Sequence, residues 1–185
     1  MKLRNLLLVV FSGLLFTSFA QKQITKTGTI EIFSETPVFT IEAVNKKVAS
    51  ILNVETGDIV VSTLVRSFKF HEALVEEHFN ENYMESHKYS KAIFKGKISN
   101  YQSIDFTKDG SYDAIVEGKL TLHGETNYIK EKALITIKDK IISAVSEFDI
   151  SLEAYKIKVE NAYKESIKDD ILLKMHFEYK PYHKK

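Results

Sequence analysis

Apolar and polar residues alternate along most of the second half of the chain, and strict alternation is typical of a half-buried β-strand. The clearest runs are 111–125, 128–140, 141–155 and 171–179. The segments HGETN and KDK, which separate the first three runs, have the composition of turns. Strands joined by such short turns predict an antiparallel sheet in which consecutive strands are neighbours.

The first half of the chain adds more strand-like segments and a helical pattern. Four segments are predicted as strands, at 24–33, 39–43, 49–54 and 59–70. Apolar residues recur at helical spacing in HEALVEEHF, residues 71–79, and more weakly in KVENAYKESI, residues 158–167. The chain is therefore predicted to be mostly β, with about eight strands and one or two short helices.

An eight-stranded antiparallel sheet has one arrangement that leaves no free edge. When it closes into a barrel, the interior has room for packed side chains or for one small ligand. Two packed sheets would satisfy the same alternation. The predicted fold is an eight-stranded antiparallel barrel, with a sandwich as the alternative.

The first twenty residues have the pattern of a secretory signal peptide. Lys2 and Arg4 precede an apolar run at 6–16, and small residues stand before a cleavage site after Ala20. The apolar run is too short for a stable bilayer span, although an uncleaved anchor is the alternative. We therefore predict a signal peptide at 1–20 and a mature domain at 21–185 that is periplasmic or secreted. The chain has no cysteine to carry a lipid anchor.

Composition narrows the classes of function. Of the 26 basic residues, Lys2 and Arg4 belong to the signal peptide, so the mature chain has 24 basic and 25 acidic residues. Such a balance gives no reason to expect nucleic acid as a partner. The absence of cysteine excludes disulfides, so the core must stabilise the domain by itself. Twelve phenylalanines and nine tyrosines supply large apolar side chains for that core.

The histidine-rich segment HEALVEEH does not have the spacing of a zinc site. A metalloprotease helix needs histidines four residues apart, whereas His71 and His78 would lie roughly 10 Å apart along a helix. The chain also has no nucleophile elbow, phosphate loop or dinucleotide fingerprint. We expect no metal, no cofactor and no catalytic residues, and the protein is interpreted as a non-enzyme.

Large apolar residues and small ones share the predicted inward faces. Gly118 and several alanines stand among bulky neighbours, and small inward residues leave space in a barrel. The alternative is a core filled by side chains. The candidate apolar lining consists of Phe68, Leu74, Phe79, Phe94, Val116, Gly118, Leu120, Ile135, Phe148 and Phe177.

The stretch EHFNENYMESHKY, residues 77–89, is predicted to end a short helix and cross one mouth of the barrel. Leu74, Val75 and Phe79 would then cover the interior. Four residues with polar groups would lie at the boundary with water and contact the polar end of a bound ligand: His71, His78, Asn82 and Tyr83.

The segment ALVEEHFNENYMESHKYSKAIFKGKI, residues 73–98, closely resembles a segment of YceI-like proteins. The matching residues are Leu74, His78, Phe79, Asn80, Glu81, Asn82, Tyr83, Met84, Glu85, Ser86, Lys88, Tyr89, Phe94, Lys95 and Gly96. Ser90 departs from the family, which usually has proline there. The segments 28–48 and 116–126 also resemble the family, so the likeness covers most of the mature chain.

The resemblance implies an exported, lipocalin-like eight-stranded barrel that holds an isoprenoid-type lipid in an apolar tunnel. It carries over no catalytic residue. The leading hypothesis is therefore an exported lipid-binding protein whose partner is a hydrophobic, isoprenoid-like lipid. The alternative is a non-enzymatic, stress-related structural or interaction protein with a filled barrel, and a hydrolase that uses the histidine-rich mouth is a third.

Overall fold

A computed structural model describes residues 21–35, 40–159 and 170–182. The predicted signal peptide and most of the predicted helix at 158–167 lie outside these ranges. Within them, no helix is long and apolar enough to cross a membrane.

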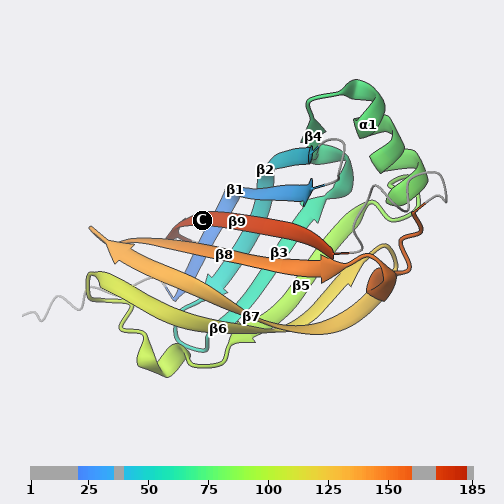
Figure 1. Cartoon of the computed structure of the whole chain (residues 1–185). Coiled ribbons are helices and arrows are strands. Elements are labelled where there is room, and N and C mark those ends of the chain that lie inside the picture. Colours follow the sequence, from blue (N-terminus) through green and yellow to red (C-terminus); the bar gives the residue numbers. More distant parts are fainter. Residues whose placement is uncertain (1–20, 36–39, 160–169, 183–185) are drawn as a thin grey trace, which may run out of the picture.

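Eight long antiparallel strands close into a barrel (Figure 1). They are β1 (Lys22–Glu35), β2 (Thr40–Asn53), β3 (Asp58–Leu64), β5 (Lys91–Ile98), β6 (Gly110–Leu122), β7 (Glu125–Lys138), β8 (Ile141–Ser151) and β9 (Asp170–Pro181). Their order around the barrel is β1, β9, β8, β7, β6, β5, β3 and β2, and the pairing of β1 with β2 closes the ring. The barrel prediction is confirmed, and the sandwich alternative is wrong.

Two details of the predicted strands differ from the structure. Residues 40–43 and 49–53 of two predicted segments belong to one strand, β2, because the polar residues between them remain in the sheet. Asn45 is fully buried there and donates hydrogen bonds to Thr63 Oγ1 and the Leu64 carbonyl. The predicted strand 59–70 ends at Leu64, and a 3-10 turn, η1 (Val65–Ser67), leads into the two-residue strand β4 (Lys69–Phe70) beside β2.

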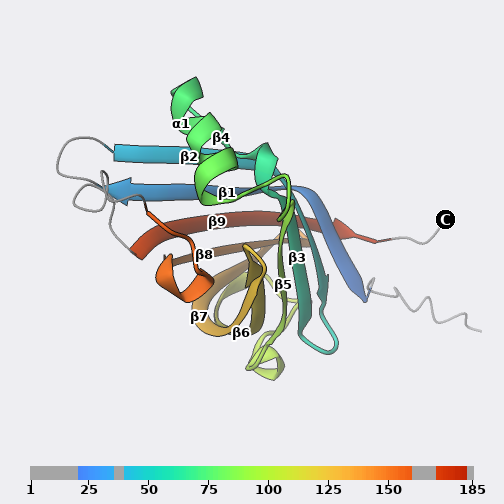
Figure 2. The same ribbon diagram turned by 90° about the vertical axis from the view of Figure 1, so that its right-hand side faces the viewer.

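A short helical segment crosses the barrel at the end where β3 finishes and β5 begins. It consists of the α-helix α1 (Ala73–His78) and a π-helical turn, η2 (Phe79–Tyr83). At the opposite end, the connection between β5 and β6 contains the 3-10 turn η3 (Tyr101–Ser103). Figure 2 shows α1 above the barrel and this connection below it.

The barrel has a filled half at the end near η3. Ile104 and Phe106 from the β5–β6 connection are buried there together with inward side chains of the strands. Tyr179 is 1 % exposed, and its hydroxyl lies 2.8 Å from Ser50 Oγ. Burial raises the pKa of Tyr179 well above its ordinary value. The side chains that fill this half are Val48, Leu52, Ile98, Ile104, Phe106, Ala114, Ile135, Ile137, Ile142 and Tyr179.

Two glycines face each other where β5 and β6 pair. Gly96 is the register partner of Gly118. A Cβ on Gly118 would lie 2.4 Å from both the Gly96 Cα and the Lys95 carbonyl oxygen, so no side chain fits there. We predicted that Gly118 opens space in the interior; the correction is that it permits close approach of two backbones.

Candidate functional site

The half of the barrel nearest α1 is hollow. It contains a cavity of about 400 Å³, within the range of small-molecule binding sites. Every strand and the helical segment contribute to its wall, which is mainly apolar. Lining residues outside the predicted set include Ile30, Ile32, Ile59, Val61, Met84, Leu122, Ile129, Ile150, Leu173 and Met175.

Most of the predicted lining residues surround this cavity, namely Phe68, Leu74, Phe79, Phe94, Val116, Leu120, Phe148 and Phe177. Ile135 is 1 % exposed and packs in the filled half instead. Gly118 is absent from the wall for the reason given above.

Alanine at inward positions accounts for much of the space. Ala92, Ala133 and Ala144 line the cavity from β5, β7 and β8. Ala144 pairs with Ile135 across the β7–β8 ladder, so the boundary between the filled and hollow halves passes through this pair. Phe177, the β9 partner of Ala144, belongs to both the buried cluster and the cavity wall.

The helical segment forms a mouth on one side of the cavity. Phe79 packs between Phe68 and Phe70, with ring centroids 5.8 Å and 4.8 Å away. Leu74 lines the cavity yet is 62 % exposed, so the cavity reaches solvent beside α1. Both Leu74 and Phe79 thus cover the interior as predicted, and Val75 lines it with them.

The four polar residues predicted at this mouth are divided between two environments. His78 and Tyr83 line the cavity. The side chain of His71 is 95 % exposed and is on a separate polar groove along α1, and Asn82 is exposed outside the cavity wall. The structure therefore brings only His78 and Tyr83 to the apolar interior.

A lateral slot separates β7 from β8 in the hollow half. The ladder between these strands runs from Lys138↔Ile141 to Leu134↔Val145 and ends there. Figure 1 shows β7 and β8 together near their hairpin and apart farther along. Val145 points outward and is 42 % exposed, yet it also lines the cavity, so the slot connects the interior with the outer surface.

Side chains span the slot in place of backbone hydrogen bonds. Ser146 Oγ donates to the Lys132 carbonyl over 2.6 Å, directly beyond the last ladder pair. Farther along, Asn127 Nδ2 donates to the Ala154 carbonyl over 2.6 Å. The alternating sequence pattern of β7 and β8 does not predict where their ladder ends. Alternation shows which side chains of a strand are buried, but it does not show which neighbouring strand the backbone pairs with.

Among the described residues, Glu131 is the one carboxylate in the cavity wall. It stands on the inward face of β7 between Ile129 and Ala133 and pairs with Val116 of β6. Burial raises the pKa of Glu131, and the negative charge of Asp149 raises it further. Glu131 was not among the predicted site residues. The sequence feature that indicates it is a glutamate at an inward position of a strand whose other inward residues are apolar.

The sequence matches the YceI-like domain family over residues 16–179. The chain belongs to the YceI-like domain family. A search of curated proteins found no match.

Solved structures of low sequence identity share the fold of this YceI-like chain. A polyisoprenoid binding domain from Saccharophagus degradans has a TM-score of 0.76 at 11 % identity, covering 88 % of this chain and 99 % of that one. BcnA from Burkholderia cenocepacia has a TM-score of 0.70 at 15 % identity, covering 83 % and 96 %. The YCEI protein of Campylobacter jejuni has a TM-score of 0.57 at 15 % identity, covering 77 % and 85 %.

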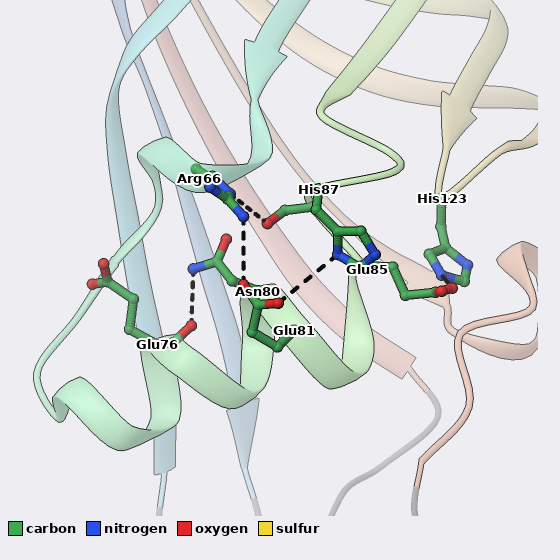
Figure 3. A network of polar contacts seen from close by, with 8 residues as sticks. Arg66, Glu76, Asn80, Glu81, Glu85, His87 and His123 are labelled. Carbon is green, nitrogen blue, oxygen red and sulfur yellow. Dashed lines mark hydrogen bonds and ion pairs between the residues drawn. The ribbon is translucent and has the colours of Figure 1, made fainter.

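Polar contacts hold the HFNENY segment of this YceI-like domain against the barrel (Figure 3). Arg66 of η1 donates to Ser86 Oγ over 3.0 Å and contacts Glu81 at 3.4 Å. His87 approaches the other oxygen of the Glu81 carboxylate at 3.8 Å. These contacts join the turn after β3 to the turn before β5, which fixes the position of the mouth.

A second set of contacts fixes α1 itself. Glu76 forms an ion pair with Lys69 of β4, which lowers the pKa of Glu76. Asn80 Nδ2 donates to the Glu76 carbonyl over 2.9 Å (Figure 3). This bond ties the side chain of Asn80 to the backbone of α1.

His123 connects three loops at the same end of the barrel. Its ring nitrogens lie 3.1 Å from the Tyr155 carbonyl and 3.0 Å from the Glu85 carboxylate. The ring of Tyr89 packs edge-on against it at 4.6 Å. Glu85 and His123 have φ of 41° and 49°, a left-handed conformation that costs about 1–2 kcal/mol per residue. The contact between the Glu85 carboxylate and His123 offsets part of that strain.

The described residues contain no group of three or more histidine, aspartate or glutamate side chains arranged to hold a metal ion. The chemistry that the site offers is an apolar cavity with His78, Tyr83, Ser146 and Glu131 at its margins.

Proposed function

We propose that this YceI-like protein binds a hydrophobic lipid of the isoprenoid type in the hollow half of its barrel. The observation that carries the proposal is the apolar cavity of about 400 Å³ with openings beside α1 and between β7 and β8. Burial of each CH₂ group contributes about 0.8 kcal/mol, so an apolar wall binds an isoprenoid chain without specialised chemistry.

The comparisons support the same class of ligand. The chain belongs to the YceI-like domain family, and one of its structural neighbours is a polyisoprenoid binding domain. In this proposal the protein binds its ligand and does not transform it. The lining residues Phe68, Leu74, Phe79, Phe94, Val116, Leu120, Phe148 and Phe177 contact the apolar chain, and His78 and Tyr83 lie where it meets water.

The proposal includes export, which the signal-peptide pattern of residues 1–20 supports. Protein recovered from the cell envelope should then begin at Gln21, as N-terminal sequencing would show. Membrane-bound protein that retains residues 1–20 would contradict export of a free protein and favour the anchor.

Native mass spectrometry before and after organic extraction tests the binding function. The purified protein should carry a hydrophobic mass that extraction removes, and an isoprenoid should restore it. A variant that fills the cavity, Ala133→Leu with Ala144→Leu, should remain folded and carry less lipid, because both side chains point into the hollow half.

Leu134→Ala is the matched control, since Leu134 points outward from the same strand. It should keep the lipid. A wild-type protein that carries no lipid and takes up none would contradict the proposal and favour a structural role for the barrel.

A further inference from the structure

The polar groups of the lateral slot belong to β7 and β8, whereas the mouth is formed by the helical segment. Glu131 faces inward from β7, and Ser146 lines the cavity from β8. Both lie where the β7–β8 ladder has ended, beside the outward Val145. A polar end of a bound lipid could thus lie in the slot with water on one side, while its chain occupied the cavity.

Glu131 has acceptor capacity that the protein does not use. Among the described residues it forms no hydrogen bond or ion pair. Lys130, the neighbour of Glu131 along β7, pairs instead with Glu117, and Lys174 of β9 pairs with Glu147. A half-buried carboxyl group without a donor is unfavourable unless another molecule supplies one.

Ser146 adds a second acceptor at the same place. Its hydroxyl proton is directed to the Lys132 carbonyl, which leaves the lone pairs of Oγ available. The side chains of the slot therefore offer acceptors, and a matching head group must provide donors.

The charge of the wall favours the same conclusion. No lysine or arginine lines the cavity within the described ranges, and the carboxyl group of Glu131 lies within the electrostatic influence of a second acidic residue, Asp149. A phosphate or diphosphate in the slot would face like charge without a cation to balance it. A hydroxyl group would donate to the carboxylate without that repulsion.

We infer that Glu131 and Ser146 form a head-group subsite that selects isoprenoid lipids ending in an uncharged hydrogen-bond donor, such as a hydroxyl group, over the corresponding phosphates. The inference rests on the proposed lipid-binding function and adds the polar end of the ligand to it. It places that end in the β7–β8 slot, whereas His78 and Tyr83 line the cavity from the helical segment.

The test compares two probes with the same apolar chain, geranylgeraniol and geranylgeranyl phosphate. Each is titrated into delipidated mature protein, with displacement of a fluorescent fatty acid as the signal. Wild type should bind the alcohol at least about tenfold more tightly, a factor that corresponds to 1.4 kcal/mol. Glu131→Gln should reduce the ratio to about threefold or less, mainly because the phosphate binds better.

Glu147→Gln is the matched control. It makes the same change of charge on β8, but Glu147 is exposed and points away from the cavity. It should keep the wild-type ratio. His78→Ala should also keep the ratio, although it weakens both probes if the mouth contributes to retention.

Three results would overturn the inference: equal binding of both probes to wild type, a ratio unchanged by Glu131→Gln, or a ratio abolished by His78→Ala. In each of these cases both lipids still bind, so the proposed function survives. Failure of both probes to bind wild type would instead contradict the proposed function, and the head-group subsite would fall with it.

Discussion

The two halves of the barrel are built from the same strands but use their inward positions differently. Toward η3, Ile135, Ile137 and Ile142 belong with Phe106 to one cluster of buried side chains. Toward α1, Ala133 and Ala144 replace such bulk, and the wall surrounds open space. A single strand such as β7 therefore contributes to stability at one end and to a binding cavity at the other. This division allows the cavity to exist without loss of a packed core.

The largest effect on stability should come from the filled half. Ile135→Ala removes a side chain that is 1 % exposed, and we expect a loss of about 3–5 kcal/mol in the free energy of unfolding. Chemical denaturation measures it. Leu134→Ala on the exposed face of the same strand should cost less than about 1 kcal/mol. Equal losses from the two variants would mean that the filled half is not the stabilising one.

The glycine pair between β5 and β6 should give the next largest effect. Gly118→Ala forces a Cβ into the opposite backbone, so we expect a loss of about 3 kcal/mol, again by chemical denaturation. Gly110→Ala, at the start of β6, meets only the flexible ring of Tyr112 at 3.3 Å and serves as the control. A stable Gly118→Ala protein would show that the strands can move apart.

Changes at the mouth should separate stability from binding. Phe79 is half-buried, so Phe79→Ala should cost about 2–3 kcal/mol, less than a fully buried phenylalanine. His78→Ala should leave the thermal transition nearly unchanged and reduce the lipid retained per folded molecule. If His78→Ala unfolds the protein as severely as Phe79→Ala and leaves the lipid content unchanged, the histidine has a structural role only.

The smallest expected effect is the pH dependence caused by Glu131. Because its pKa in the folded protein is raised above the ordinary 4.5, the folded state holds more protons than the unfolded state just above that pH. Stability then falls as the pH rises through this window, and the cost persists at neutral pH. Glu131→Gln should raise Tm by roughly 1–3 °C at pH 7, and the gain should vanish below pH 4.5.

Glu147→Gln is again the control for this last prediction, because it loses a solvent-exposed ion pair with Lys174. Its Tm should not rise at pH 7. A gain for Glu131→Gln that is the same at every pH would contradict the assigned cause, since titration of Glu131 could not produce it.

Much of the fold could be predicted from sequence because a strand with one buried face has an apolar residue at every second position. The inward positions Phe94, Val116, Leu120 and Phe148 follow from that period alone. The same period does not predict the buried Asn45, because a polar asparagine in sequence indicates a turn. In the structure Asn45 is buried in the sheet, where it donates a hydrogen bond to Thr63.

The candidate site was less accessible to this reasoning. The division into filled and hollow halves depends on Ile104 and Phe106, which enter the barrel from a connection and not from a strand. The slot depends on where one ladder ends, and the role of Glu131 depends on the slot. These features arise from contacts between segments far apart in sequence, which no local pattern records.

The incomplete ladder between β7 and β8 also has a kinetic consequence. Beyond Leu134↔Val145, the two strands can separate further without loss of a register pair between them. The Ser146 and Asn127 side-chain bonds are among the contacts that resist this separation. A wider opening is then a local fluctuation, independent of the global unfolding equilibrium. The rate at which a ligand enters or leaves can therefore change through these two side chains while the melting temperature of the barrel stays the same.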